Sequence, residues 1–478
     1  MTNNRNFGLI AGLALVLAAA PHQALAAGFE VFHAFQGTND GEYPEGGLIA
    51  DSYGNLYGTT FGSLESGGPG KKCPKNCGSV YGFDESGTQT FHYFFNGDNE
   101  GAFPTGEALL EGTTLYGTTE YGPKTGCGGL GCGTVYQIQS DGSKDTIVSY
   151  FCMESNCTDG VFPHGALIAD QDGTSFFGIT ILGGTGAGWL CGSDVGGCGT
   201  VFQYMPNGDR SVLYSFCSLS RCKDGAVPFG KLLQDKKGNL YGTTQFGGTH
   251  SRGTIFRLKP PVHLGDLWTE KVLYSFCADI EDGICADGAV PEAGLIADEA
   301  GNLYGTTTFG GENVTTCSDD LGCGVIFKLA PDGTYIVLHP FVGGTDGGLP
   351  QSALVADSAG NLYGTTLRGG GGGTSCANHV PTGCGTVFML ASDGSVMTLH
   401  AFGRSDGVHP EGSLLLLDDR YLYGATRESG KKPCACGTLY RLDLQAAMTA
   451  QPPRLLGLPP NWRGAGGPAR KPGHSGRP

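Results

Sequence analysis

One short motif, Gly-Asn-Leu-Tyr-Gly-Thr-Thr, recurs along most of the chain and constrains its fold more than any other feature. With looser copies included there are seven, at intervals of 59 to 64 residues. Their aligned aromatic residues are Tyr57, Tyr116, Phe177, Tyr241, Tyr304, Tyr363 and Tyr423. A fixed period indicates a repeat architecture, in which each period is one unit that packs on its neighbours.

Each repeat contains four runs rich in β-branched and aromatic residues, separated by turn residues. In the sixth repeat these runs are residues 353–356, 361–366, 385–390 and 396–402. A tight Asp-x-x-Gly-Asn turn joins the first two runs, and an Asp-Gly or Asn-Gly pair joins the last two. Such pairs are strong hairpin signals. Four antiparallel strands repeated seven times are typical of the blades of a β-propeller.

The two ends of the repeat region complement each other. The seventh repeat stops after its third strand, residues 437–444, and an unpaired fourth strand, residues 29–35, stands near the N-terminus. The N-terminal strand would complete the last blade and close the ring. The sequence therefore predicts an all-β fold, a seven-bladed β-propeller of four-stranded blades.

The N-terminus predicts export. Arg5, the apolar residues 9–20 and the Ala24-Leu25-Ala26 site are typical of a signal peptide spanning residues 1–26. An uncleaved anchor is the alternative. We expect the propeller to span residues 27–445 and the Pro-, Gly- and Arg-rich tail, residues 446–478, to be disordered. The 18 cysteines favour an oxidising compartment, so we expect a secreted or periplasmic protein, or one associated with the cell surface.

The alternation of strands divides the loops between two faces. The turn face carries the short turns within the first and last strand pairs of each blade. The loop face carries the long connections between second and third strands and between successive blades. The cysteines form nine sequence-local pairs, all on the loop face. We predict the disulfides Cys73–Cys77, Cys127–Cys132, Cys152–Cys157, Cys191–Cys198, Cys217–Cys222, Cys277–Cys285, Cys317–Cys323, Cys376–Cys384 and Cys434–Cys436.

Zinc is the alternative for these pairs, but no histidine recurs beside them, so we predict no metal and no cofactor. Cys434 and Cys436 form the weakest pair because a bridge across one residue is strained, and they stay open to a reduced or redox-active state.

The loop face also carries a recurring acid-Gly-x-x-Pro motif. Its aspartates are candidate ligand-binding residues: Asp40, Asp159, Asp224, Asp287, Asp346 and Asp406. A ring of acids suits cations or sugar hydroxyls. The alternative is a structural turn, in which the aspartate accepts backbone amides and the proline fixes the next strand. Recurrence in every blade favours the turn.

The recurring sequence LIADxxGNLYGTTxxGG…CGTVFxLxxDGxxxxLYSFxxxxDGxxPxG resembles the GloVer tandem repeats of exported bacterial proteins, over roughly residues 29–444. The resemblance implies a propeller-like fold and brings no catalytic residues. Members are often tethered by C-terminal anchors, whereas the tail of this chain carries no hydrophobic anchor.

No motif of a hydrolase, metalloprotease, P-loop or EF-hand is present, so we predict no catalytic residues. His33, His339 and His400 share a repeat position with tyrosines, which indicates packing, and the non-repeating His164 and His409 are interpreted as surface residues. The net charge of −16 argues against nucleic acid as a partner.

Three functions are open. The favoured one is a non-enzymatic, monomeric protein that binds an extracellular glycan or protein through its loop face. The second is a carbohydrate-active or other hydrolytic enzyme with acids in the channel of the propeller. The third is a purely structural surface protein.

Overall fold

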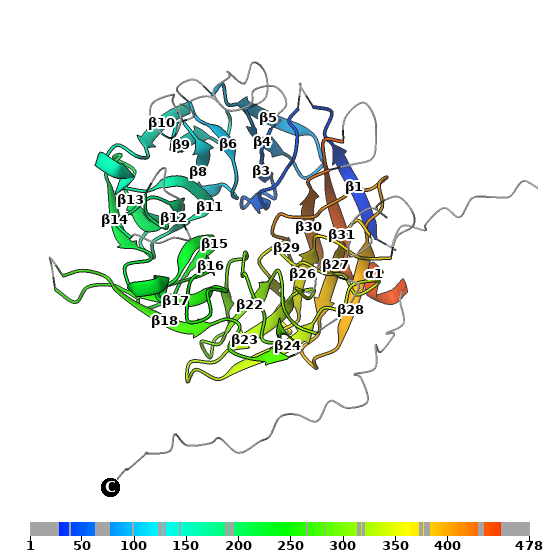
Figure 1. Cartoon of the computed structure of the whole chain (residues 1–478). Coiled ribbons are helices and arrows are strands. Elements are labelled where there is room, and N and C mark those ends of the chain that lie inside the picture. The colour runs from blue at the N-terminus through cyan, green and yellow to red at the C-terminus, as the bar shows by residue number, and fades with distance from the viewer. Residues whose placement is uncertain are drawn as a thin grey trace, which may run out of the picture.

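Seven antiparallel sheets stand around a ring in the computed structural model (Figure 1). The structure describes residues 28–450 except for 38–39, 63–76, 98–99, 123–126, 128–130, 143–144, 187–190, 192–195, 264–265, 282, 313–316, 318–320, 372–375, 377–382 and 429–434. The predicted seven-bladed β-propeller is confirmed. The predicted signal peptide lies outside the described residues. No helix in the described part of the chain is both long and apolar enough to span a membrane.

The first four blades follow the chain order, from the innermost strand outward. Blade 1 holds β2 (Ile49–Ala50), β3 (Leu56–Thr60), β4 (Ser79–Phe83) and β5 (Gln89–Phe94). Blade 2 holds β6 (Ala102–Pro104), β7 (Leu109–Glu111), β8 (Thr114–Tyr121), β9 (Thr134–Gln139) and β10 (Asp145–Tyr150). Blade 3 holds β11 (Val161–Ala169), β12 (Phe176–Leu182), β13 (Thr200–Tyr204) and β14 (Arg210–Ser215). Blade 4 holds β15 (Ala226–Gln234), β16 (Leu240–Phe246), β17 (Thr254–Lys259) and β18 (Thr269–Ser275).

The remaining blades complete the ring. A small hairpin of β19 (Ile280–Glu281) and β20 (Ile284–Cys285) precedes blade 5. Blade 5 holds β21 (Ile296–Ala297), β22 (Leu303–Thr307), β23 (Val325–Leu329) and β24 (Tyr335–Pro340). Blade 6 holds β25 (Val355–Ala356), β26 (Leu362–Thr366), β27 (Thr386–Leu390) and β28 (Val396–Ala401). Blade 7 holds β29 (Leu415–Leu417), β30 (Tyr421–Thr426), β31 (Thr438–Asp443) and the N-terminal β1 (Phe29–Ala34).

Five of the seven second strands contain Gly-Thr-Thr, and its three residues make three separate contacts, shown here by β26 of blade 6. A Cβ on Gly364 would lie 2.6 Å from the ring of Phe388, so a side chain has no room there. Thr365 Oγ1 donates to Pro410 O of the next blade at 3.0 Å. Thr366 Oγ1 lies 2.7 Å from Thr386 Oγ1 on the neighbouring strand of its own blade. The motif recurs because it joins strands within a blade and blades to one another.

A second contact between blades explains the Cys-Gly and x-Pro positions. Gly385 has a φ of 107°, and a Cβ on it would lie 2.5 Å from Cδ of Pro410 in the next blade. His409, just before that proline, has a φ of 57° and donates its N–H to Cys384 O at 3.0 Å. Tyr43, Phe103, Phe162, Val227, Val290 and Leu349 stand before the other blade-entry prolines with equally positive φ. Positive φ is costly for residues other than glycine, so the contact must hold them in place.

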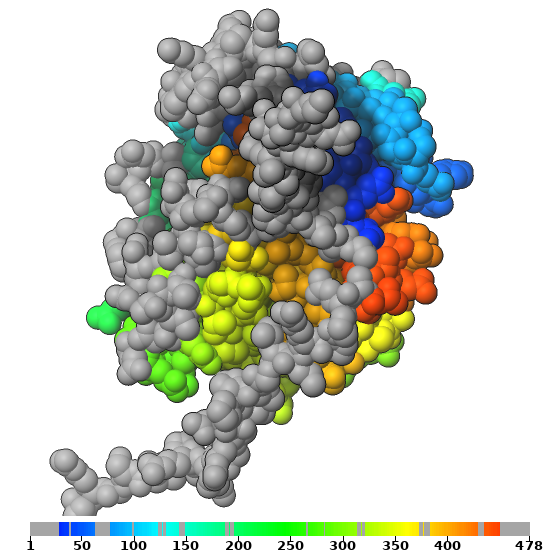
Figure 2. Space-filling view, turned by 90° about the vertical axis from the view of Figure 1, so that its right-hand side faces the viewer, coloured from blue at the N-terminus to red at the C-terminus, as the bar shows by residue number. Residues whose placement is uncertain are grey.

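The N-terminal strand closes the ring as predicted. β1 pairs with β31 in antiparallel register, and Figure 2 shows the blue N-terminal strand against the red C-terminal elements. Phe29 is buried and stacks on His400 of blade 6 at 3.6 Å between ring centroids. The N-terminal strand therefore completes both the last blade and its contact with the neighbouring blade.

The expected start of the tail is wrong by a few residues. After β31 the chain forms helix α1 (Leu444–Ala450) instead of leaving the fold at residue 446. Asp443 Oδ1 accepts the N–H of Gln445 at 3.0 Å and of Ala446 at 3.3 Å, as a helix N-cap does. Leu444 and Ala447 are buried against blade 7. Residues 451–478 lie outside the described part of the chain.

Candidate functional site: the wall of the central channel

The repeat breaks at the residue that follows each blade-entry proline. These seven residues begin the innermost segments of the blades and line one cavity of about 230 Å³ on the ring axis: Glu45, Thr105, His164, Phe229, Glu292, Gln351 and Glu411. Around them the backbone is closely packed, because a Cβ on Gly106 would lie 2.3 Å from Gly165 O of the next blade. Seven equivalent positions thus carry a mixture of acids, a base, amide, hydroxyl and aromatic groups.

Two of the acids share one arginine. Arg427, just after β30, contacts Glu45 Oε1 through Nε at 2.9 Å and Glu411 Oε1 through Nη1 at 3.4 Å. Burial raises the pKa of Glu45 to about 8, and the nearby Glu411 adds to the shift while Arg427 opposes it. Burial also raises the pKa of Glu411. At neutral pH this group therefore combines a protonated carboxyl, a second carboxyl and a guanidinium.

Glu292 lies in a different kind of environment. Its Oε1 accepts from Gln245 Nε2 at 2.9 Å, and its Oε2 accepts from Thr308 Oγ1 and Gln351 Nε2, both at 2.7 Å. Burial raises the pKa of Glu292, while these three donors lower it. The three donors come from blades 4, 5 and 6, so this cluster ties the wall of the channel together.

Two polar atoms in the wall have no hydrogen-bond partner among the described residues. They are Thr105 Oγ1 and His164 Nδ1. Thr105 is only 8% exposed, and burial lowers the pKa of His164 to about 4, so the imidazole is neutral. The His164 ring lies 4.0 Å from the ring of Phe229. A buried polar group without a partner costs about 1–3 kcal/mol, so these atoms are positioned to bond a guest molecule or water.

Aromatic rings form a row on the loop-face side of blades 1 to 3. Phe61 lies 4.9 Å from Phe103, Phe103 lies 5.6 Å from Tyr121, and Tyr121 lies 5.3 Å from Phe162. Beside Tyr121, burial raises the pKa of Glu120, which also contributes to the raised pKa of Glu45. The rings of this row do not line the cavity, whose wall combines its acids with the ring of Phe229. Acids beside a ring surface suit sugar rings and cationic groups.

The predicted aspartates lie away from this cavity, in the turns between blades. Asp224 is fully buried and accepts from Ser218 N at 2.8 Å, Leu219 N at 3.1 Å and Tyr214 Oη at 2.9 Å. Main-chain donors from the equivalent turn also bond Asp40, Asp159, Asp287, Asp346 and Asp406. This arrangement favours the structural turn over ligand binding.

The interchange of histidine and tyrosine in the outer strands also has its cause in these turns. Tyr214 and Tyr274 donate to Asp224 and Asp287, while His33, His339 and His400 lie against Asp40, Asp346 and Asp406 at 2.8–3.3 Å. Blade 2 has a serine at this position, and Arg210 of blade 3 pairs with Asp159 instead. For the other aspartates the sequence signal was a histidine or tyrosine a few residues before the acid.

Seven of the predicted disulfides are present, and they brace the loop face. They are Cys127–Cys132, Cys152–Cys157, Cys191–Cys198, Cys217–Cys222, Cys277–Cys285, Cys317–Cys323 and Cys376–Cys384. For the other two pairs, Cys73 and Cys434 lie outside the described residues, and Cys436 is disulfide-bonded.

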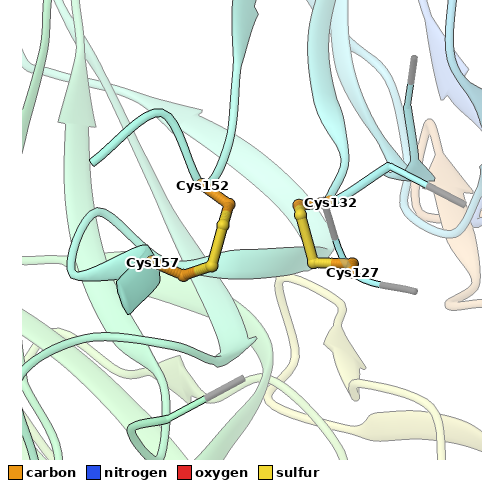
Figure 3. A group of neighbouring side chains, drawn as sticks. All are labelled: Cys127, Cys132, Cys152 and Cys157. Atoms are coloured by element: carbon orange, nitrogen blue, oxygen red, sulfur yellow. A yellow bond between two sulfur atoms is a disulfide. The ribbon is translucent and has the colours of Figure 1, made fainter. Parts of the chain in front are cut away.

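Neighbouring bridges come close together between blades 2 and 3. Figure 3 shows Cys127–Cys132 beside Cys152–Cys157, and their four Sγ atoms lie within 4.8 Å of one another. One bridge belongs to a loop of blade 2 and the other to the connection into blade 3. The two bridges therefore stiffen the same junction.

A profile of the Gloeobacter/Verrucomicrobia repeat matches residues 73–317 and 315–451. The chain belongs to this repeat family. The expected resemblance is confirmed, and the cysteine-glycine and proline contacts between blades are the structural form of the repeat. A search of curated protein sequences finds no significant match.

Solved structures similar to this Gloeobacter/Verrucomicrobia repeat protein are propellers of low identity. The extracellular domain of a hybrid two-component system from B. thetaiotaomicron has a TM-score of 0.50 at 12% identity, over 88% of this chain and 42% of that one. The chain thus spans less than half of that structure. A Trypanosoma rangeli sialidase has a TM-score of 0.42 at 13% identity, over 89% and 61%. A luciferin-regenerating enzyme has a TM-score of 0.41 at 13% identity, over 84% and 92%.

Sequence patterns did not predict the channel residues of this repeat protein. Glu45, Glu411 and Arg427 carry no motif, and His164 was interpreted as a surface residue although it lines the cavity. The available signal was the column after each blade-entry proline, where seven aligned positions hold five residue types. These positions can be recognised because their residues differ between blades, whereas no residue common to all blades identifies them.

Proposed function

We propose that this protein is exported and binds the end of an extracellular glycan in its central channel, without catalysis. The observation that carries the proposal is the cavity on the ring axis, whose lining varies at the residue that follows a proline kept in all seven blades. The partnerless Thr105 Oγ1 and His164 Nδ1 supply hydrogen bonds for hydroxyl groups. Phe229 supplies a ring surface beside them.

The volume of the cavity and the charges in its wall limit the class of ligand. A volume of about 230 Å³ lies below the roughly 300 Å³ at which pockets for drug-sized ligands begin, so one sugar ring or chain end enters. Carboxyl groups outnumber cationic groups in the wall, which favours a neutral or amino-bearing sugar over an acidic one. Loops held by disulfides lose less entropy when a longer glycan binds across the loop face.

A glycan array with the mature protein tests this proposal. Wild type is compared with the double variant Glu45→Gln/Glu411→Gln and with Glu85→Gln/Glu299→Gln, which makes the same two substitutions at exposed turn-face positions. We expect wild type and the turn-face variant to bind the same glycans and the channel variant to bind at least about tenfold more weakly. Absence of any bound glycan, or equal binding by the channel variant, would overturn the proposal.

Hydrolysis is the second candidate, because of one observation. The raised pKa of Glu45 keeps that carboxyl protonated at neutral pH next to Glu411, which resembles a general acid beside a base. Release of sugar from bound glycans by wild type, abolished in Glu45→Gln while binding persists, would favour an enzyme over a binding protein.

A further inference from the structure

Blade 4 concentrates positive charge on the turn face of an otherwise acidic protein. The chain has 29 Lys and Arg against 45 Asp and Glu. Lys237 lies in the turn before β16, Arg257 and Lys259 lie on β17, and Lys271 lies on β18. These elements are successive strands of one sheet, so the four cations are neighbours.

The strand register places two of these cations face to face. Arg257 pairs with Lys271 across β17 and β18, and with Tyr241 across β16 and β17. Like charges directly opposite on neighbouring strands destabilise a sheet. None of the four cations forms an ion pair with a carboxylate in the described part of the chain. Their charge is thus not neutralised by an ion pair among the described residues.

A pocket lies among these residues. It has a volume of about 290 Å³ and is lined by Lys237, Asn239, Arg257, Lys259 and Pro260. Arg257 Nε is buried and has no hydrogen-bond partner among the described residues. The nearby carboxylate of Asp235 is engaged elsewhere, because it accepts from Asn239 Nδ2 at 2.7 Å, Tyr241 Oη at 3.0 Å and Lys237 N at 2.8 Å.

A cation also stands at the position of Arg257 in blade 5 (Lys328) and in blade 7 (Arg441), but blades 5 and 6 lack the two lysines that flank it in blade 4. Ala300 of blade 5 and Ala359 of blade 6 stand where blade 4 has Lys237. Ala330 and Ala391 stand where it has Lys259. The link between the third and fourth strands is also longer in blade 4, where β17 ends at Lys259 and β18 begins at Thr269. As in the channel, the repeat is broken where a pocket forms.

We propose that this pocket binds the phosphate group of a small soluble molecule. A guanidinium presents a planar fork of donors that matches phosphate oxygens, and lysines add charge from both sides. The bound anion gives Arg257 Nε its missing acceptor. The site lies on the turn face and is independent of the glycan proposed for the channel.

Equilibrium dialysis with labelled inorganic phosphate at fixed ionic strength tests the site. The variant Lys237→Ala/Lys259→Ala removes two exposed lining cations. Its control, Lys223→Ala/Lys328→Ala, makes the same charge change on the loop face and in blade 5. We expect saturable binding of one phosphate to wild type and to the control, and binding at least about tenfold weaker in the pocket variant.

Two results overturn the proposal. One is the absence of saturable phosphate binding to wild type. The other is an equal loss of binding in both double variants, which would assign the attraction to net charge alone. Arg257→Gln gives a further check, because it keeps polarity while removing the guanidinium, and its melting temperature reports whether the blade still folds.

Discussion

Single side chains hold the turns that connect one blade to the next. Asp224 shows this most clearly, because its buried carboxylate bonds two backbone amides and the hydroxyls of Tyr214 and Ser218. An ionised carboxylate in such a position is tolerated because every oxygen is engaged. The equivalent aspartates hold equivalent turns, which explains why the acid, the glycine and the proline recur together.

The turn interpretation predicts a loss of stability without a loss of binding. We expect Asp224→Ala to lower the free energy of unfolding by about 3 kcal/mol, because four donors lose a buried acceptor. Chemical denaturation measures the change. Glycan binding by the folded variant should match that of wild type. A variant that is as stable as wild type but no longer binds glycan would show instead that this aspartate is a ligand-binding residue.

At the scale of elements, the junction of two blades is the structural unit. The carbonyl of Cys384 accepts His409 N–H, Thr365 reaches Pro410, and Gly385 leaves room for the proline ring. Paired disulfides stiffen such a junction on the loop face, as Cys127–Cys132 and Cys152–Cys157 do between blades 2 and 3. The bridges act on the loops and connections rather than on the strands.

Removal of these two bridges tests the coupling. Cys127→Ser/Cys132→Ser alone should cost about 2 kcal/mol or less, because the closed loop is short. The four-cysteine variant should differ from the sum of the two double variants by more than about 0.5 kcal/mol, because neighbouring groups do not act independently. A double-mutant cycle by urea denaturation measures this, and strict additivity would contradict a shared junction.

Sequence patterns predicted the strands well and the site poorly, for a physical reason. β26 begins and ends within a residue of the expected range because Tyr363 and the glycine and threonines around it perform the same contacts in most blades. Glu45 and Arg427 meet only because the ring closes, so no local pattern reports their contact. The sequence likewise did not predict helix α1 and its N-cap Asp443, because the helix is too short to show a hydrophobic periodicity.

For the whole molecule, closure of the ring depends on β1. β1 supplies the outer strand of blade 7, and its buried Phe29 and adjoining Phe35 pack against blades 6 and 1. A ring without this strand exposes the edge of β31 and separates the two ends of the chain. The propeller is therefore expected to unfold as one cooperative unit.

Deletion of residues 27–36 tests closure. Loss of two buried phenylalanines alone costs about 3–6 kcal/mol, so we expect a lower melting temperature and a broader transition. A synthetic peptide of residues 28–36 should restore part of the stability when added in excess. Unchanged cooperativity in the deletion variant would contradict the role given to this strand.

Closure also brings together the carboxyls of Glu45 and Glu411, and this affects the pH dependence. The folded protein holds a proton on Glu45 that the unfolded chain loses near its ordinary pKa of 4.5. The stabilising effect is complete below that pH and is lost as pH rises toward 8, on the order of a few kcal/mol. Glu45→Gln should flatten this decline.

The measurement that tests the channel most directly is the NMR titration of the Glu45 side chain in protein labelled with ¹³C at glutamate, with Glu45→Gln as the assignment control. We predict a carboxyl that releases its proton at a pKa of about 8, because it is buried in the channel wall beside Glu411. A titration near 4.5 would contradict the account, because it would place Glu45 in solvent and remove the crowded acid cluster from the proposed binding site.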